Sequence, residues 1–186
     1  MPRTCARCGG PIDLLKPGRV PTYCSTRCRV AANRAKVPAE LRERDRWVRH
    51  ERKRPITAAG SAASSTDPGT WSSYAAMKRS TVGDGIGFVL GDGIGCFDLD
   101  HCLVNGRPTA AAAAFLAQLP ATYVEISPSG SGLHVWGLIP PGHGSRRRRP
   151  DGLHVERYST GRYITVTGRP FAGSVSRLAD LSEVGL

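Results

Sequence analysis

Two aspartates lie one residue apart at the end of an apolar run, in the stretch GCFDLDHC. Side chains alternate between the two faces of a β-strand, so Cys96, Asp98 and Asp100 are predicted to point one way. Phe97 and Leu99 then point the other way, toward a core. Two carboxylates side by side repel each other unless something positive lies between them. The spacing therefore indicates a charged site on one face of a strand, unless the pair simply ends that strand.

Two later stretches place further polar groups on predicted strands. In SPSGSGLHVWG a Ser/Gly loop runs into a strand, where alternation puts His134 and Trp136 on one face and Leu133 and Val135 on the other. In VERYSTGRYITVTG a single strand acid, Glu156, has several basic neighbours. Taken alone, the loop can be only a turn and the strand glutamate can face solvent. The three stretches in order within one domain favour a shared site.

Four of the six cysteines form two close pairs, Cys5 with Cys8 and Cys24 with Cys28, which are separated by fifteen residues. Thiols at this spacing predict a tetrahedral zinc site of the treble-clef or ribbon type, with two disulfides as the alternative. The Ser-Thr dipeptide after Cys24 can cap a helix that carries Cys28. A segment this short buries little apolar surface, so bound metal would stabilise its fold.

The formal net charge of +11 is concentrated in the first third of the chain. Residues 1–54 contain fifteen Lys or Arg against five acids, whereas residues 55–186 contain eleven against ten. A basic segment attached to a near-neutral domain predicts a polyanionic partner, most commonly nucleic acid. Solvated surface charge is the alternative. The predicted DNA-contacting residues lie near the cysteines and in a later loop: Arg27, Arg29, Arg34, Arg146, Arg147, Arg148 and Arg149.

Three parts are predicted along the chain: a zinc-binding module over residues 1–36, a basic helical linker over residues 37–54 and a main domain over residues 55–186. The linker is predicted to be helical because Pro38 precedes a long charged stretch, PAELRERDRWVRHERKR, whose few apolar residues can pack on one side.

Short strands dominate the main domain. Residues 85–90 and 94–100 are predicted strands joined by a hairpin-like turn, Gly91-Asp92-Gly93, and the later strands are TYVEIS, GLHVWGLI, GLHVERY and RYITVTG. Helices are predicted over TWSSYAAMKRS and over residues 109–119, between two prolines. The predicted fold class is α+β, with a mostly antiparallel sheet and flanking helices.

The order of these motifs resembles a known family. Asp-Leu-Asp, then Ser-Gly-x-Gly-Leu-His, then a strand acid is similar to the three motifs of the archaeo-eukaryotic primase superfamily, above all the primase–polymerase domains of phages, plasmids and integrated elements. The flanking segments KRPIT and GIGFVLGDGIGCFDLD are similar too, and the resemblance covers roughly residues 47–170. It implies the RRM-like catalytic core of that superfamily.

The resemblance also implies roles for the site residues. In that family an acidic pair and a later acid hold two divalent cations, Mg²⁺ or Mn²⁺, which here implicates Asp98, Asp100 and Glu156. Many relatives have Asp where this chain has Glu156. The phosphates of the incoming nucleotide would be bound by the remaining predicted site residues: His134, Ser129, Ser131, Arg162, Lys53 and Arg157.

The implied activity is primer synthesis on single-stranded DNA from NTPs or dNTPs, by a DNA primase with DNA polymerase activity as a further option, for a phage or mobile element. We expect a soluble protein without membrane contact, in the cytoplasm of a bacterial host and associated with its nucleoid. A separate replicative helicase is a candidate partner. The alternatives are an inactive nucleic-acid-binding regulator on a primase-like core and a metal-dependent nuclease.

Overall fold

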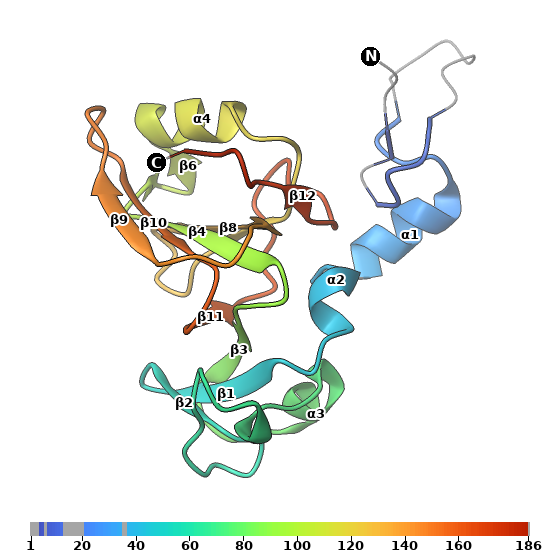
Figure 1. Cartoon of the computed structure of the whole chain (residues 1–186). Helices are drawn as coiled ribbons and strands as arrows, with labels where there is room; N and C mark the ends of the chain where they lie inside the picture. The colour runs from blue at the N-terminus through green and yellow to red at the C-terminus, as the bar shows by residue number, and fades with distance from the viewer. Residues whose placement is uncertain (1–3, 6, 13–20, 35–36, 186) are drawn as a thin grey trace.

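Most of the strands belong to two mostly antiparallel sheets of unequal size (Figure 1). The computed structural model describes residues 4–5, 7–12, 21–34 and 37–185, with the backbone alone for residues 31–34. No helix within these ranges is long and apolar enough to cross a lipid bilayer. The predicted α+β class with mostly antiparallel pairing is confirmed.

The larger sheet has the strand order β12-β8-β4-β10-β9, with β7 paired to the same strand β8. Within the described part of the chain, β12 and β8 form its only parallel pair. Its members are β4 (Ile94–Asp100), β7 (Val124–Ile126), β8 (Leu133–Leu138), β9 (Ser145–Arg148), β10 (His154–Tyr158) and β12 (Ala179–Asp180).

The smaller sheet has the order β11-β3-β1-β2 and lies below the larger one in Figure 1. Its strands are β1 (Trp47–Glu51), β2 (Arg54–Ile56), β3 (Gly85–Val89) and β11 (Tyr163–Val166). A short two-stranded ribbon, β5 (Leu103–Val104) with β6 (Arg107–Pro108), follows β4.

Short helices flank the sheets, and their ends match the sequence. α4 (Ala110–Ala117) begins after Thr109, whose hydroxyl accepts the N–H of Ala112, and Figure 1 shows α4 above the larger sheet. Ser73 caps α3 (Tyr74–Arg79) in the same way. The remaining helical segments are α1 (Thr26–Arg34), α2 (Ala39–Arg42) and the 3₁₀ turn η1 (Pro68–Thr70).

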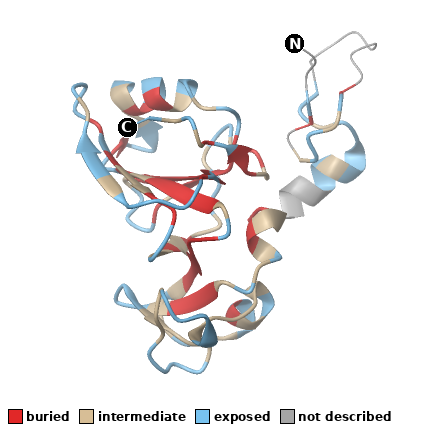
Figure 2. Cartoon of the chain, viewed as in Figure 1, coloured by how far each residue is buried: buried red, intermediate tan, exposed pale blue. Residues whose placement is uncertain are grey.

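The two faces of the larger sheet contact different partners. Phe97 and Leu99 pack into a cluster with Phe115 of α4, whereas Cys96 and Trp136 pack into a second cluster that includes residues of the smaller sheet. Figure 2 shows the buried residues concentrated in the central strands of both sheets. The alternation predicted for the GCFDLDHC stretch is confirmed, and exposure grows toward the end of β4, where its carboxylates lie.

The helix predicted over the linker is wrong for most of its length. Only Ala39–Arg42 is helical, and Trp47–Glu51 forms β1, between β2 and β3. The strand ends at Glu51, and the next two residues, Arg52 and Lys53, both have positive φ (46° and 66°) and join β1 to β2 as a two-residue turn. Pairing on both edges of β1 outweighs the helical propensity of its charged residues.

The predicted hairpin between residues 85–90 and 94–100 is also wrong. The turn is present, with positive φ at Asp92 and Gly93 (52° and 76°). However, β3 lies between β1 and β11, so neither of its edges is free for another strand. The chain therefore leaves the smaller sheet at this turn, and β4 becomes a central strand of the larger sheet.

Candidate active site

A row of five polar residues crosses the larger sheet in direct register. Glu125 of β7 pairs with His134 of β8, His134 with Asp98 of β4, Asp98 with Glu156 of β10, and Glu156 with Arg146 of β9. Side chains at directly opposed positions share a face and lie close together. Strand register thus brings together residues that are far apart in the sequence.

Asp98 is the centre of the row. Its side chain is 24% exposed, and its Oδ1 lies 3.8 Å from Nε2 of His134. Burial raises the pKa of the Asp98 carboxyl above its ordinary value, and the negative charges of Asp100 and Glu156 act in the same direction, while His134 opposes them. Because the ionised form of Asp98 is destabilised in this way, a nearby cation would stabilise it.

Glu156 lies on the other side of Asp98 and contacts two arginines. Its carboxylate is 3.1 Å from Nε of Arg146 and 3.5 Å from Nη1 of Arg162, and it accepts a hydrogen bond of 2.6 Å from the hydroxyl of Tyr158. The Arg162 guanidinium stacks over the Tyr158 ring at 4.0 Å. Burial and the hydrogen bond to Glu156 raise the pKa of Tyr158. Two cationic groups therefore sit next to the acids.

Arg146 was predicted to lie in a loop, and that prediction is wrong, because Ser145–Arg148 forms the edge strand β9. Alternation along β9 puts Arg146 and Arg148 on the face of the acids and Arg147 on the opposite face. Arg149, just beyond the strand, pairs with Asp151 and lies over the ring of Phe115. The four arginines therefore do not form one surface.

The Ser/Gly loop ends beside the acids. Its hydroxyls form a chain, with Ser127 and Ser129 oxygens 3.0 Å apart and Ser129 and Ser131 oxygens 3.1 Å apart. Gly130 has a positive φ of 79°. A Cβ on Gly132 would lie 2.7 Å from the carbonyl oxygen of Leu99, so only glycine lets the loop approach β4 this closely. The predicted phosphate-binding serines are thus placed next to the end of β4.

Two residues predicted to contact the nucleotide, Arg157 and Lys53, do not lie in the polar row. Arg157 follows Glu156 on β10, so its side chain lies on the opposite face. Lys53 is exposed in the β1–β2 turn of the smaller sheet, where its carbonyl accepts a hydrogen bond of 2.7 Å from the hydroxyl of Tyr163. The contacts of Arg162, in contrast, place it directly at the acids.

Glu125 was missed in the sequence. It lies in TYVEIS, where an acid between apolar residues on a buried strand is the signal that was available. Its side chain is fully buried and contacts both His134 and Trp136.

Oxygen ligands suit the divalent cations that the acid triplet was predicted to hold. Asp98, Asp100 and Glu156 offer carboxylate oxygens on one face, which is the ligand chemistry of Mg²⁺ and Mn²⁺. In the described residues, however, three or more potential ligand atoms converge at the four cysteines and not at these carboxylates. The reason is visible at Glu156, whose carboxylate is turned toward Arg146 and Arg162.

The four cysteine sulfurs lie within 4.8 Å of one another. Cys24 is 3.6 Å from both Cys8 and Cys28, too far for a disulfide bond of about 2.05 Å. Sulfurs of a zinc tetrahedron with bonds of about 2.3 Å would be roughly 3.8 Å apart. The cluster can therefore bind zinc, and the disulfide alternative does not fit.

Local structure around the thiols supports metal binding. Gly9 has a positive φ of 71° in the turn after Cys8, and Ser25 accepts the N–H of Cys28 at the start of α1. Burial alone would raise the pKa of the Cys5 thiol, but hydrogen bonds from backbone N–H groups lower it to about 6. On α1, Arg27 and Arg29 are exposed, whereas the side chain of Arg34 lies outside the described residues.

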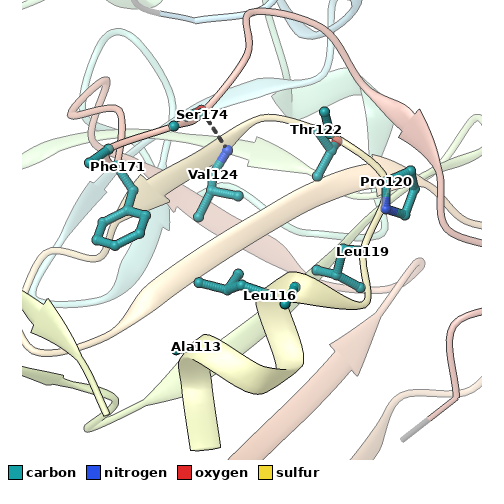
Figure 3. Close-up of a pocket in the computed structure, with 12 residues that line it drawn as sticks. Ala113, Leu116, Leu119, Pro120, Thr122, Val124, Phe171 and Ser174 are labelled. Carbon is teal, nitrogen blue, oxygen red and sulfur yellow. Dashed lines mark hydrogen bonds between the residues drawn. The ribbon is translucent and has the colours of Figure 1, made fainter. Parts of the chain in front are cut away.

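An apolar hollow lies on the other side of the larger sheet, between α4 and the segment after β11 (Figure 3). Leu116, Leu119, Val124 and Phe171 line it, together with the backbone around Ser174. It offers few polar groups and no acid, so it is separate from the polar row.

Two comparisons with known proteins both match DNA primase-polymerases. Residues 20–180 match the family described as "Bifunctional DNA primase/polymerase, N-terminal". Over 136 residues the chain is 40% identical to the DNA primase-polymerase of Nitratiruptor phage NrS-1. That match covers 68% of this chain but 19% of the phage protein, so the chain spans about a fifth of its relative's length.

Proposed function

Because the chain belongs to the family of bifunctional DNA primase/polymerase N-terminal domains, we propose that it catalyses template-dependent nucleotidyl transfer, as a DNA primase, a DNA polymerase or both. The 3′-hydroxyl of one nucleotide attacks the α-phosphorus of the next. A new phosphodiester bond forms and the hydroxyl proton is released to solvent, while the bond from the α-phosphorus to the oxygen that bridges it to the β-phosphate breaks and pyrophosphate leaves. The main observation behind this proposal is the row of paired polar residues across the larger sheet. In it Asp98 and Glu156 lie opposite each other, beside His134 and the Ser/Gly loop.

Asp98, Asp100 and Glu156 would hold the divalent cations. Mg²⁺ or Mn²⁺ bound there would stabilise negative charge on the attacking and leaving oxygens. Glu156 must then release at least one of its two guanidinium partners, which lie 3.1 and 3.5 Å away. A triphosphate is the natural new partner for a released arginine, because guanidinium groups bind phosphate oxygens with two parallel hydrogen bonds.

The remaining polar groups would bind the triphosphate. His134 lies beside Asp98, and Ser129 and Ser131, whose hydroxyls contact each other, belong to the loop whose Gly132 packs against the backbone of Leu99 near the end of β4. Arg162 and Arg146 approach from the β10 side. Side chains on both sides of the acids would therefore be available to contact the phosphates of a bound nucleotide.

The cysteine cluster would hold a structural zinc ion, and its helix α1 would contact the template. Exposed Arg27 and Arg29 on that helix supply positive charge for single-stranded DNA. NTPs or dNTPs are the other substrates. The phage source of the matched relative supports a role in phage or mobile-element replication inside a bacterial host cell, with a separate helicase as a candidate partner.

Primer synthesis on single-stranded DNA tests the proposal. The assay contains labelled nucleotides, Mg²⁺ or Mn²⁺ and no primer, and a parallel reaction contains a primed template. Asp98→Asn/Asp100→Asn protein, which keeps the side-chain shapes, serves as the control. Products that depend on both aspartates in either reaction support the proposal.

The alternatives predict other outcomes. Intact DNA binding without synthesis in either reaction would contradict the proposal in favour of a binding regulator. Cleavage of an end-labelled template, lost in the double variant and without synthesis, would instead indicate a metal-dependent nuclease.

A further inference from the structure

Glu125 lies at the buried end of the polar row, on β7, and nothing in the proposed chemistry uses its carboxylate directly. It is 0% exposed. A carboxylate without water is costly unless hydrogen-bond donors replace that water, and a neutral side chain would fill the same space without the cost. The donors that surround Glu125 therefore indicate what its charge does.

One oxygen of Glu125 is held by the protein scaffold. Oε2 accepts hydrogen bonds from the backbone N–H groups of Thr167 (3.1 Å) and Gly168 (2.9 Å) and from the hydroxyl of Tyr123 (3.0 Å). These donors come from the residue just before β7 and from the segment that follows β11. They fix the carboxylate in position and leave Oε1 pointing at β8.

The other oxygen faces two ring nitrogens. Oε1 lies 3.3 Å from Nε1 of Trp136 and 3.4 Å from Nδ1 of His134. The indole nitrogen can only donate, and an ionised carboxylate can only accept. The hydrogen bond to His134 therefore requires a proton on Nδ1, which leaves Nε2 as the nitrogen on the side of Asp98, 3.8 Å from Oδ1.

We infer that Glu125 is the positioning residue of His134: it accepts the Nδ1 proton, holds the ring plane and thereby presents Nε2 to the acids and the incoming nucleotide. The ring is confined, since His134 is 4% exposed and packs edge-on against Trp136. The contact with nucleotide rests on the proposed function, whereas the hydrogen bond to Nδ1 does not.

Nitrogen NMR of the histidine ring in the full chain tests the hydrogen bond without any substrate. Spectra are recorded well above the ordinary histidine pKa of about 6.5, so that each ring carries a single proton. We expect that proton on Nδ1 of His134 in the wild type. Its presence on Nε2 instead would overturn the inference, whether or not the chain has polymerase activity.

Glu125→Gln sharpens this test. The backbone N–H groups of Thr167 and Gly168 require an acceptor, so the amide oxygen should take the place of Oε2 and the amide NH₂ the place of Oε1. Facing a donor, Nδ1 must become the acceptor, and the ring proton should move to Nε2.

Tyr123→Phe is the matched control. It removes the 3.0 Å hydrogen bond to Oε2 of the same carboxylate and leaves Oε1, the oxygen that faces His134, unchanged. A purely structural role for Glu125 predicts similar behaviour of the two variants. The positioning role predicts that Tyr123→Phe keeps the Nδ1 proton, because Thr167 and Gly168 still hold Oε2 and Oε1 still faces His134, even where its thermal midpoint falls.

Single-nucleotide incorporation on a primed template tests the consequence for function. We expect Glu125→Gln to lower kcat/KM by about tenfold or more, the size of effect seen when a partner that orients a functional histidine is removed. In the double variant Glu125→Gln/His134→Ala, the loss should equal that of His134→Ala alone, because the first residue acts through the second. Additive losses would overturn the inference.

Discussion

Asp98 and Glu156 are direct register partners across the β4–β10 pair, on the face of the larger sheet that also presents His134. Like charges in opposed positions destabilise a sheet. Here Glu156 is compensated by Arg146 at 3.1 Å, and Asp98 lies 3.8 Å from Nε2 of His134, which compensates its charge when the ring is protonated on both nitrogens. The fold thus accommodates two opposed carboxylates that would destabilise the sheet without such neighbours.

Asp98→Asn should separate activity from stability. Loss of this carboxylate should lower nucleotide incorporation by about 10²- to 10³-fold, the range for removing one group that stabilises transition-state charge. Burial raises the pKa of Asp98, so its ionised form opposes folding. In metal-free protein at neutral pH, the variant should therefore melt at a higher temperature than the wild type.

The pH dependence of that difference has a defined sign. A carboxyl whose pKa is raised in the folded state favours the protonated form, so the wild type loses stability relative to Asp98→Asn as pH rises from the ordinary Asp pKa of about 3.9 through the raised value. Above that window the difference should be constant. Circular-dichroism melts of both proteins from acid to neutral pH measure it, and a difference that shrinks as pH rises would contradict the assigned burial effect.

Arg162→Ala should raise the KM for the incoming nucleotide by about tenfold or more, since a hydrogen bond to a charged group contributes roughly 1.5–3 kcal/mol. Arg162→Lys should recover only part of the loss, because lysine keeps the charge but lacks the planar group that stacks over Tyr158. Steady-state incorporation kinetics measure both. Arg79→Ala, which removes an exposed charge from α3, is the control, and an equal effect there would point to general electrostatics.

Purified protein should contain about one zinc ion per chain, bound by the four cysteines. Metal analysis of the wild type and of Cys8→Ser measures this. A chelator should reduce the helical signal of α1 while the melting of the two sheets is unchanged, because the cluster draws its ligands from the first 28 residues. Full metal content in Cys8→Ser would contradict this assignment.

Arg27→Ala/Arg29→Ala should weaken binding of single-stranded DNA and make it less sensitive to salt. Each lost phosphate contact should reduce the slope of log Kobs against log salt concentration by about 0.7. Fluorescence anisotropy at several salt concentrations gives the slope. A change in affinity with an unaltered slope would indicate that the arginines act through the shape of α1 rather than through phosphate.

Much of the site chemistry was predictable from the sequence because a strand has a period of two. The faces of Asp98, His134 and Glu156, the position of the Ser/Gly loop and the helix predicted over residues 109–119 all depend on local sequence. The cysteine spacing likewise predicted a cluster that the structure brings together. The predictions were wrong where pairing between distant strands determines the structure. Residues 47–51 form an inner strand instead of a helix, and the two strands of residues 85–100 belong to different sheets instead of one hairpin.

The sequence by itself thus determined which residue types are present and which face each strand residue takes. Only the tertiary structure decided which residues of different strands meet, because register between distant segments depends on the whole packed sheet and leaves no local signature. That is why Glu125 was overlooked although it lies opposite His134. For the same reason Arg146 was placed in a loop, and Arg157 was grouped with a site on the other side of its sheet.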